Sequence, residues 1–444
     1  MDFHYTFPAI DEQVLSNGIR TVWLPDFRHQ VLTVTLQIPS GRFFDSAGFE
    51  GTAELTAGLM LKGPSSLTSE EFAEKLEHAG ATLFADVKEE YTIIGVRILF
   101  READTIVPLF WEMVTEPSLD AKEFNRLKKE MLTGLQAEFA DPSILANRHF
   151  NAALFGYQHP AGRNRSMETV KRITLAQVTE FYTKVIGPVN CCLVVAGACT
   201  IEDMKNRWEH LFENWHKSSD KDSKQNHTVS VLTENRIRII DKPEYSQATV
   251  ILGHQGIPEL HKNRIPLAIA NYILGGGNFS SRLMARIRTE TGKTYGINSQ
   301  LNSLKHFGTF TIETSTQTGQ LGDVIRSIVD VYTTFIHSGP TEEEIKKAKQ
   351  FVLGNMAFEL EGLNNVVEKL LWLRFYGREN SYIENFSSLI NPIDANLISQ
   401  VLQSDFAFSH FVIVAVGRET EITAQLKEFG SPKYFKPRDN PFRK

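Results

Sequence analysis

An apolar run that ends in glycine, Leu193-Val194-Val195-Ala196-Gly197, recurs about 220 residues later as Ile413-Val414-Ala415-Val416-Gly417. Short runs of β-branched and aliphatic residues that stop at a glycine are typical of buried strands. Because such a strand recurs at so large a spacing in a chain of 444 residues, the sequence indicates two copies of one structural unit.

Two further landmarks recur at nearly the same spacing. An alternating strand at 18–25 (GIRTVWLP) has its counterpart at 236–243 (RIRIIDKP). Helix starts recur where Asp120 and Thr341 can each cap first-turn amides, with a glutamate three residues further on that can reach back. The three offsets predict a tandem duplication. The predicted parts are a first domain at 1–217, a polar linker at 218–232 and a second domain at 233–444.

Each half alternates β-rich segments with amphipathic helices. The expected strands include 31–38 and 91–100 in the first half, and 248–253 and 308–314 in the second. Adjacent strands joined by short loops, with helices gathered between them, predict an α+β fold. We therefore expect two homologous domains, each a largely antiparallel sheet packed with helices.

The composition excludes several classes of protein. Lys and Arg number 47 against 53 Asp and Glu, a net charge of -6, and the basic residues are scattered, so neither nucleic acid nor a membrane is an expected partner. Cys191, Cys192 and Cys199 lie in or beside one apolar strand, which excludes a disulfide scaffold. No signal peptide or membrane-spanning stretch is recognisable, so the expected location is cytoplasmic.

Common catalytic patterns are missing from the sequence. No two of the 13 histidines have the i, i+4 spacing of a helical zinc site, and there is no Gly-x-Ser-x-Gly elbow. The run Gly275-Gly276-Gly277 lacks the Lys-Ser/Thr of a phosphate-binding loop and is expected to form a turn. Asn278 or Ser280 is expected to cap the helix that continues through 282–288.

Several motifs in combination resemble one family. GTAELTAGLMLKGP at 51–64, followed by LTSEEF at 67–72, is similar to the inverted zinc segment of the pitrilysin and mitochondrial processing peptidase superfamily. That segment reads Gly-x-x-His-x-x-Glu-His, then an apolar triplet and Lys-Gly-Thr. FGYQHP at 155–160 resembles the family's helix-ending turn, and LGGGNFSSRL at 274–283, running into RTETGKTY at 288–295, resembles its second domain. The resemblance covers essentially the whole chain and implies its duplicated fold.

The zinc segment departs from the family pattern at the residues that carry the chemistry. Where the resemblance implies His, Glu and His, this chain has Glu54, Ala57 and Gly58. Both imidazole ligands and the general base are therefore missing.

The third ligand of the family, a glutamate, would fall here at Gly134 or Leu135. Glu138 lies one turn further along the predicted helix and is expected to point elsewhere. A catalytic zinc needs about three protein ligands and an open position for water. We therefore expect this chain to bind no zinc and to have no peptidase activity alone.

The resemblance also implies a substrate-binding pair in the second domain. Family members that act on peptides carry an Arg and a Tyr, matched here by Arg288 and Tyr295, which reach toward the substrate next to the zinc. A guanidinium and a phenol can hold a peptide carbonyl and stabilise the oxyanion formed when water attacks. The structural alternative is a solvated helix residue and a packed strand aromatic; the motif around the pair favours substrate binding.

Four phenylalanines are candidates for the wall of a peptide chamber: Phe43, Phe44, Phe307 and Phe310. Aromatic residues at strand spacing more often face the core, and that is the expectation for most of them.

The leading interpretation is the non-catalytic, substrate-binding subunit of a heterodimeric zinc metallopeptidase that cleaves peptides in a closed chamber. The implied partner is a homologous subunit that carries the zinc and an intact His-x-x-Glu-His. Two alternatives remain open: a structural or assembly protein related to the core proteins of a respiratory complex, and a non-catalytic, peptide-binding homodimer. The chain expressed alone could itself form a homodimer.

Overall fold

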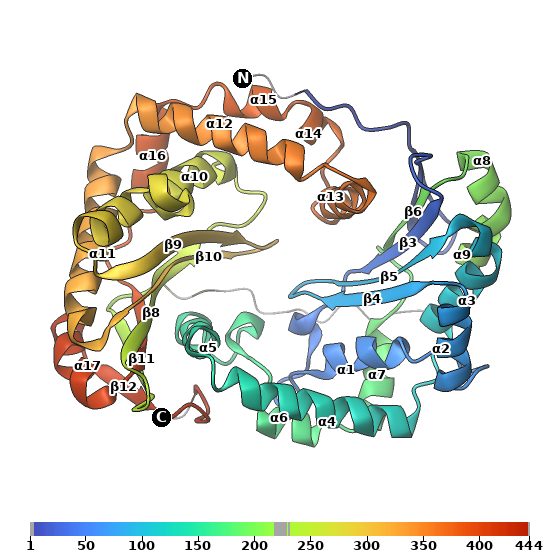
Figure 1. Ribbon diagram of the computed structural model, residues 1–444, viewed down its shortest axis with the longest axis horizontal. Helices are drawn as coiled ribbons and strands as arrows, with labels where there is room; N and C mark the ends of the chain where they lie inside the picture. The colour runs from blue at the N-terminus through green and yellow to red at the C-terminus, as the bar shows by residue number, and fades with distance from the viewer. Residues whose placement is uncertain (1–3, 217–228, 230, 443–444) are drawn as a thin grey trace.

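The structure, a computed structural model, describes residues 4–216, 229 and 231–442. Within these residues the chain forms two six-stranded sheets, one from each half, with helices packed around them (Figure 1). The predicted α+β class and the duplicated, largely antiparallel architecture are confirmed.

Apart from one edge strand, the strands of the two sheets are arranged in the same order. In spatial order, the first sheet contains β1 (Asp11–Val14), β2 (Arg20–Pro25), β6 (Cys192–Gly197), β3 (Val31–Ile38), β5 (Thr92–Leu99) and β4 (Thr82–Val87). The second contains β12 (Pro432–Phe435), β7 (Arg236–Asp241), β11 (Val412–Gly417), β8 (Gln247–Gly256), β10 (Gly308–Gln317) and β9 (Thr294–Ser303).

The helices are divided between the two halves of the sequence. Those of the first half are α1 (Thr52–Met60), α2 (Ser69–His78), α3 (Ala103–Thr115), α4 (Ala121–Glu138), α5 (Pro142–Phe155), α6 (Met167–Arg172), α7 (Leu175–Val185), α8 (Ile201–Met204) and α9 (His210–Glu213). Those of the second half are α10 (Arg264–Asn271), α11 (Leu321–Ser338), α12 (Glu342–Phe358), α13 (Leu363–Phe375), α14 (Ser381–Glu384), α15 (Phe386–Ile390), α16 (Ala395–Asp405) and α17 (Glu419–Leu426).

The repeated strands β6 and β11 lie inside their sheets and are buried along their whole length. Each pairs in parallel with one neighbour, β2 or β7, and antiparallel with the other, β3 or β8. Burial on both faces explains why these strands are continuous apolar runs rather than alternating ones. Glycine is required at the end of β6, because a Cβ on Gly197 would lie 2.2 Å from the Val31 carbonyl oxygen.

The sheets differ at one edge. In the first sheet the edge strand is β1, which pairs antiparallel with β2, whereas in the second it is β12, which pairs in parallel with β7. The two domains therefore complete their sheets from opposite ends of the chain.

One pair of equivalent helices is exchanged between the halves. Helix α5, from the first half, packs on β8 and β11 of the second sheet, and α13, from the second half, packs on β6 of the first sheet (Figure 1). Phe150 of α5 shares one apolar cluster with Ile251 and Val414, and Leu371 of α13 shares another with Val194. Each half of the chain therefore contributes one helix to the packing of the other half's sheet, although the two copies follow one another in the sequence.

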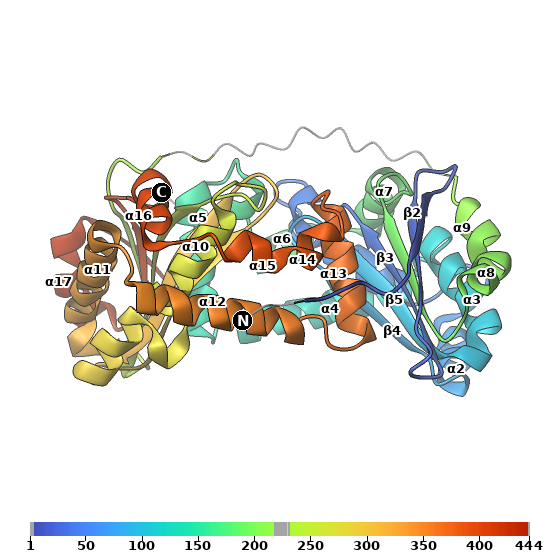
Figure 2. The same ribbon diagram turned by 90° about the horizontal axis from the view of Figure 1, so that it is seen from above.

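The two halves lie side by side in both views (Figures 1 and 2). The boundaries 1–217 and 233–444 stay predictions, and most of the predicted linker, 218–232, lies outside the described residues. The described residues contain no helix that is both long and apolar enough to cross a bilayer. The cytoplasmic location stays a prediction.

The predicted helix caps are formed, with one difference. At α12, Thr341 and Glu344 bond reciprocally, as the sequence predicted. At α4, Asp120 accepts the Glu123 amide at 2.9 Å, but the Glu123 side chain pairs with Arg126 instead of returning to the cap. The three cysteines are buried, as expected for small apolar residues of a strand.

Candidate functional site

The degenerate zinc segment forms the buried helix α1, and its start is fixed by an unusual cap. Gly51 precedes the helix with φ 110° and has no side chain to cap it. The carboxylate of Asp45 takes that role by accepting the amides of Gly51 at 2.7 Å and Ala53 at 2.8 Å. Burial raises the pKa of Asp45 to about 7 against the lowering effect of these two bonds, and the nearby carboxylates of Glu54 and Glu50 raise it further.

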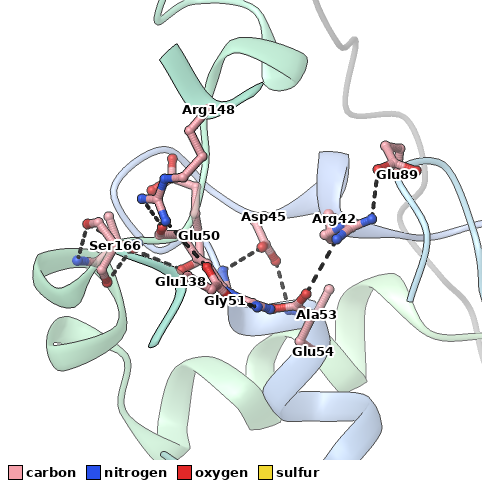
Figure 3. A network of polar contacts seen from close by, with 12 residues as sticks. Arg42, Asp45, Glu50, Gly51, Ala53, Glu54, Glu89, Glu138, Arg148 and Ser166 are labelled. Carbon is pink, nitrogen blue, oxygen red and sulfur yellow. Dashed lines mark hydrogen bonds and ion pairs between the residues drawn. The ribbon is translucent and has the colours of Figure 1, made fainter. Parts of the chain in front are cut away.

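The three positions that match the family's two histidine ligands and general base provide few groups that could coordinate zinc. Ala57 is buried and has no donor atom, and Gly58 has no side chain. Glu54 is engaged by two cations: its carboxylate bonds with Arg165 and lies 3.7 Å from Nη1 of Arg42 (Figure 3).

The expectation that Glu138 points elsewhere is wrong. At the end of α4, Glu138 turns toward the same site and accepts from Nη2 of Arg165 at 2.5 Å. A second guanidinium, Arg148, lies 3.5 Å from Glu138 and donates to the Arg165 carbonyl at 2.7 Å. The physical reason is that residues three and four apart lie on the same face of an α-helix, so Glu138 shares the face of Gly134 and Leu135 instead of pointing away from it.

This arrangement does not fit a catalytic zinc ion. Two carboxylates, Glu54 and Glu138, approach the site, but both are ion-paired with Arg165. In the part of the chain that the structure describes, no three His, Cys, Asp or Glu side chains are grouped so that they could hold a metal.

A cavity of about 850 Å³ opens beside this network and lies between the halves of the chain. Phe43 and Phe307 line it and stack on each other with centroids 5.8 Å apart, whereas Phe310 is fully buried in the second core and Phe44 packs against the first. The charged side chains on its wall are of both signs: Arg42, Asp45, Glu50, Glu54, Glu89, Glu138, Arg148, Arg163, Arg165, Glu259 and Arg264.

The tip of the β9–β10 hairpin bridges the two halves at the edge of this cavity. Both carboxylate oxygens of Glu90, in the β4–β5 loop, accept the Lys305 amide, at 3.0 and 3.1 Å. The Tyr376 hydroxyl donates to Glu90 at 3.4 Å. Burial raises the pKa of the Glu90 carboxyl, and the Lys305 amide opposes that shift.

Arg288 and Tyr295 lie apart from the cavity wall. Arg288 is in the π-helical segment η7 (Met284–Glu290), and its guanidinium lies 4.5 Å from the centroid of the Phe279 ring. Tyr295 is 86% exposed at the start of the edge strand β9, next to an irregularity in its pairing with β10. Neither side chain is among those that line the cavity. Such irregularities re-aim strand side chains and are frequent beside functional sites.

The cap expected at the start of this helix falls on another residue. Asn278 and Ser280 belong to the separate turn η6 (Asn278–Ser280), and it is Ser281 whose hydroxyl accepts the Met284 amide at 3.4 Å. The side chain of Phe279 is 70% exposed on that turn. The turn thus leaves an aromatic ring beside Arg288 at the surface.

Three residues that shape the site escaped the sequence reasoning: Asp45, Glu90 and Arg165. Each acts on a partner far along the chain or through a loop, so no helical or strand spacing connects it to the motifs. Arg165 and Glu54, for example, are 111 residues apart.

The chain belongs to the M16 peptidase family. Residues 21–163 match the family model described as Insulinase (Peptidase family M16), and residues 172–352 match the model described as Peptidase M16 inactive domain.

Curated relatives are similar along most of their length. The chain is 22% identical over 367 residues to a protein of Bacillus subtilis named Uncharacterized zinc protease YmxG, covering 81% of this chain and 87% of the relative. It is 24% identical over 376 residues to the Non-peptidase homolog YmxG of Helicobacter pylori, with 81% and 82% covered.

Solved structures share the fold. A peptidase M16 inactive domain from Pseudomonas fluorescens superposes with a TM-score of 0.82 at 23% identity, covering 92% of this chain and 98% of that one. A protease from Helicobacter pylori gives a TM-score of 0.82 at 18% identity, covering 92% and 100%.

Proposed function

We propose that this chain is the non-catalytic, substrate-binding subunit of a heterodimeric zinc metallopeptidase that cleaves peptides in a closed chamber. It binds no zinc itself, and a homologous partner subunit with an intact His-x-x-Glu-His supplies the metal and the general base. In the mixed complex, Arg288 and Tyr295 donate hydrogen bonds to the peptide carbonyl and to the oxyanion that forms beside the partner's zinc.

The observation that supports the proposal is that the degenerate zinc segment and the Arg288/Tyr295 pair lie apart within this chain. The former ligand position Glu54 is neutralised by arginines, whereas Tyr295 is 86% exposed and lies outside the cavity that Glu54 lines. Because an exposed donor on an edge strand is accessible to a second chain, the pair suits a site that another subunit completes. The names of the relatives differ on catalysis, one being called a zinc protease and another a non-peptidase homolog, so the proposal is based on this chain's own residues.

The test is to purify this chain and the homologue of the same organism that carries His-x-x-Glu-His. Zinc content and cleavage of a fluorogenic peptide are then measured for each chain alone and for the mixture. We expect no zinc in this chain and cleavage only by the mixture. Zinc and cleavage in this chain alone would refute the proposal.

Two other outcomes favour the alternatives. A stable complex without cleavage supports a structural or assembly role. A homodimer that binds peptides without cleaving them supports a non-catalytic peptide-binding protein.

A further inference from the structure

The cationic centre of the degenerate site is a side chain of this chain. Arg165 lies in the segment before α6, and its guanidinium bonds with Glu54 of α1 through Nη1 and with Glu138 of α4 through Nη2. A planar guanidinium that bonds two carboxylates through different nitrogens joins the two helices as a bridging cation does.

The neighbouring contacts fix Arg165 in place. Arg148 is 10% exposed along its side chain and donates to the Arg165 carbonyl at 2.7 Å, which holds the backbone of the segment. The following residue, Ser166, caps α6 by accepting the Thr169 amide at 3.1 Å. The guanidinium is therefore presented from a backbone that is anchored on both sides.

Charge accounts for the stability of this bridge. The side chains of Glu54, Glu138 and Arg165 are 15%, 22% and 31% exposed, so each is largely withdrawn from water. Burial by itself lowers the pKa of Arg165, but the two carboxylates more than reverse this and the net shift is upward. The guanidinium therefore remains charged, and removing it leaves two half-buried carboxylates close together.

We propose that Arg165 is a built-in cation that replaces the zinc ion, tying α1 to α4 through Glu54 and Glu138 and excluding a divalent metal from the site. The inference rests on the zinc-free part of the proposed function and needs no partner subunit. It predicts that restoring the metal-binding residues is insufficient while Arg165 is present.

The first test restores the ligands in the full chain. One variant carries Glu54→His, Ala57→Glu and Gly58→His, and a second carries the same changes with Arg165→Ala. Position 58 accepts a Cβ without a clash, because that atom would lie 3.6 Å from the nearest atom of Leu127, which is ordinary van der Waals contact. Zinc is added, the variants are dialysed, and bound metal is measured by mass spectrometry.

We expect little bound zinc in the first variant and about one equivalent in the second, whose ligands would be the two new histidines and Glu138. Circular dichroism shows whether each variant is folded. An equal amount of zinc in both variants, or none in either, would overturn the proposal. Zinc in the unmodified chain would instead refute the zinc-free part of the proposed function, so the two failures are distinguishable.

The second test measures the bridge without metal and does not depend on the restored motif. We expect Arg165→Met to lower the melting temperature by roughly 5 °C, because it removes the cation that both largely buried carboxylates share and leaves them only the longer contacts with Arg42 and Arg148. Glu54→Gln and Glu138→Gln, added to Arg165→Met, should recover at least half of that loss. The matched control is Arg172→Ala, which breaks an exposed pair with Glu168 and should change the melting temperature little. If Arg165→Met is no worse than the control, or the two Gln changes give no recovery, the bridge does not exist.

Discussion

Substitution of Phe150 tests whether helix α5, from the first half of the chain, stabilises the second sheet. The side chain is 1% exposed and packs with Ile251 and Val414, and a Cβ built on Gly253 would lie 3.0 Å from its ring. An aromatic residue buries on the order of 150–250 Å². At about 25 cal/mol per Å², the burial contributes about 4–6 kcal/mol. Since alanine retains part of this contribution and the neighbours cannot fill the cavity completely, Phe150→Ala should cost about 3–5 kcal/mol.

The assay is amide hydrogen exchange followed strand by strand. A local loss of about 3 kcal/mol corresponds to roughly a hundredfold faster exchange, and we expect it in β8 and β11 although Phe150 belongs to the first half of the sequence. The matched control is Phe110→Ala in α3, which is also 1% exposed but lies in the first core. It should accelerate exchange in β3 and β5 instead.

Two results would contradict this reasoning. If Phe150→Ala accelerates exchange in β3 and β5 rather than in β8 and β11, α5 stabilises the half to which it belongs in sequence. If both variants accelerate amide exchange equally in all strands, the two sheets unfold as one unit, and α5 does not stabilise one sheet more than the other.

Three further predictions concern the site. Arg288→Ala or Tyr295→Phe should lower turnover of the mixed complex by about 10²-fold, the loss expected for one oxyanion donor. Substitutions of two exposed residues, Arg286→Ala and Tyr434→Phe, are the controls. Unchanged turnover in both Arg288→Ala and Tyr295→Phe would contradict the proposed roles. Asp45 has its pKa raised from 3.8 to about 7, so the folded state holds a proton that the unfolded state releases, and stability should fall as pH rises from about 4 to 7. Melting curves across this range should show that Asp45→Asn lacks the decline; an identical pH dependence would mean that the carboxyl ionises normally. Glu90→Ala removes the acceptor of the Lys305 amide and should weaken docking of the hairpin by about 1–3 kcal/mol, seen as faster exchange at that amide; unchanged exchange would mean that the tip is held by other contacts.

Much of the fold was accessible from local patterns. The apolar strands β6 and β11 and the caps Asp120 and Thr341 each depend on a few adjacent residues, and their spacing showed the duplication. The loss of the zinc ligands was equally readable, because Glu54, Ala57 and Gly58 stand within one turn and a half of helix.

One site residue was misplaced by the count along the helix, and its partner could not be read from local patterns. A count along α4 placed the third ligand position at Gly134 or Leu135 and dismissed Glu138, although residues three and four apart share a helix face and the spacing itself puts Glu138 on the side of these positions. What the spacing does not give is the partner of Glu138, because Arg165 comes from the separate segment before α6.

The α+β class, the two homologous halves and the loss of the histidine ligands all follow from the amino-acid sequence, because each depends on residues that lie close together along the chain. Which sheet each amphipathic helix covers, and which cation pairs with Glu54, depend on how the chain packs in three dimensions. An apolar face indicates that a helix is buried, but it does not indicate which sheet the helix packs against. The ion pair between residues 54 and 165 joins positions 111 residues apart, so no regular spacing in the sequence predicts it. Both depend on the meeting of distant segments, which the packing of the two cores brings about.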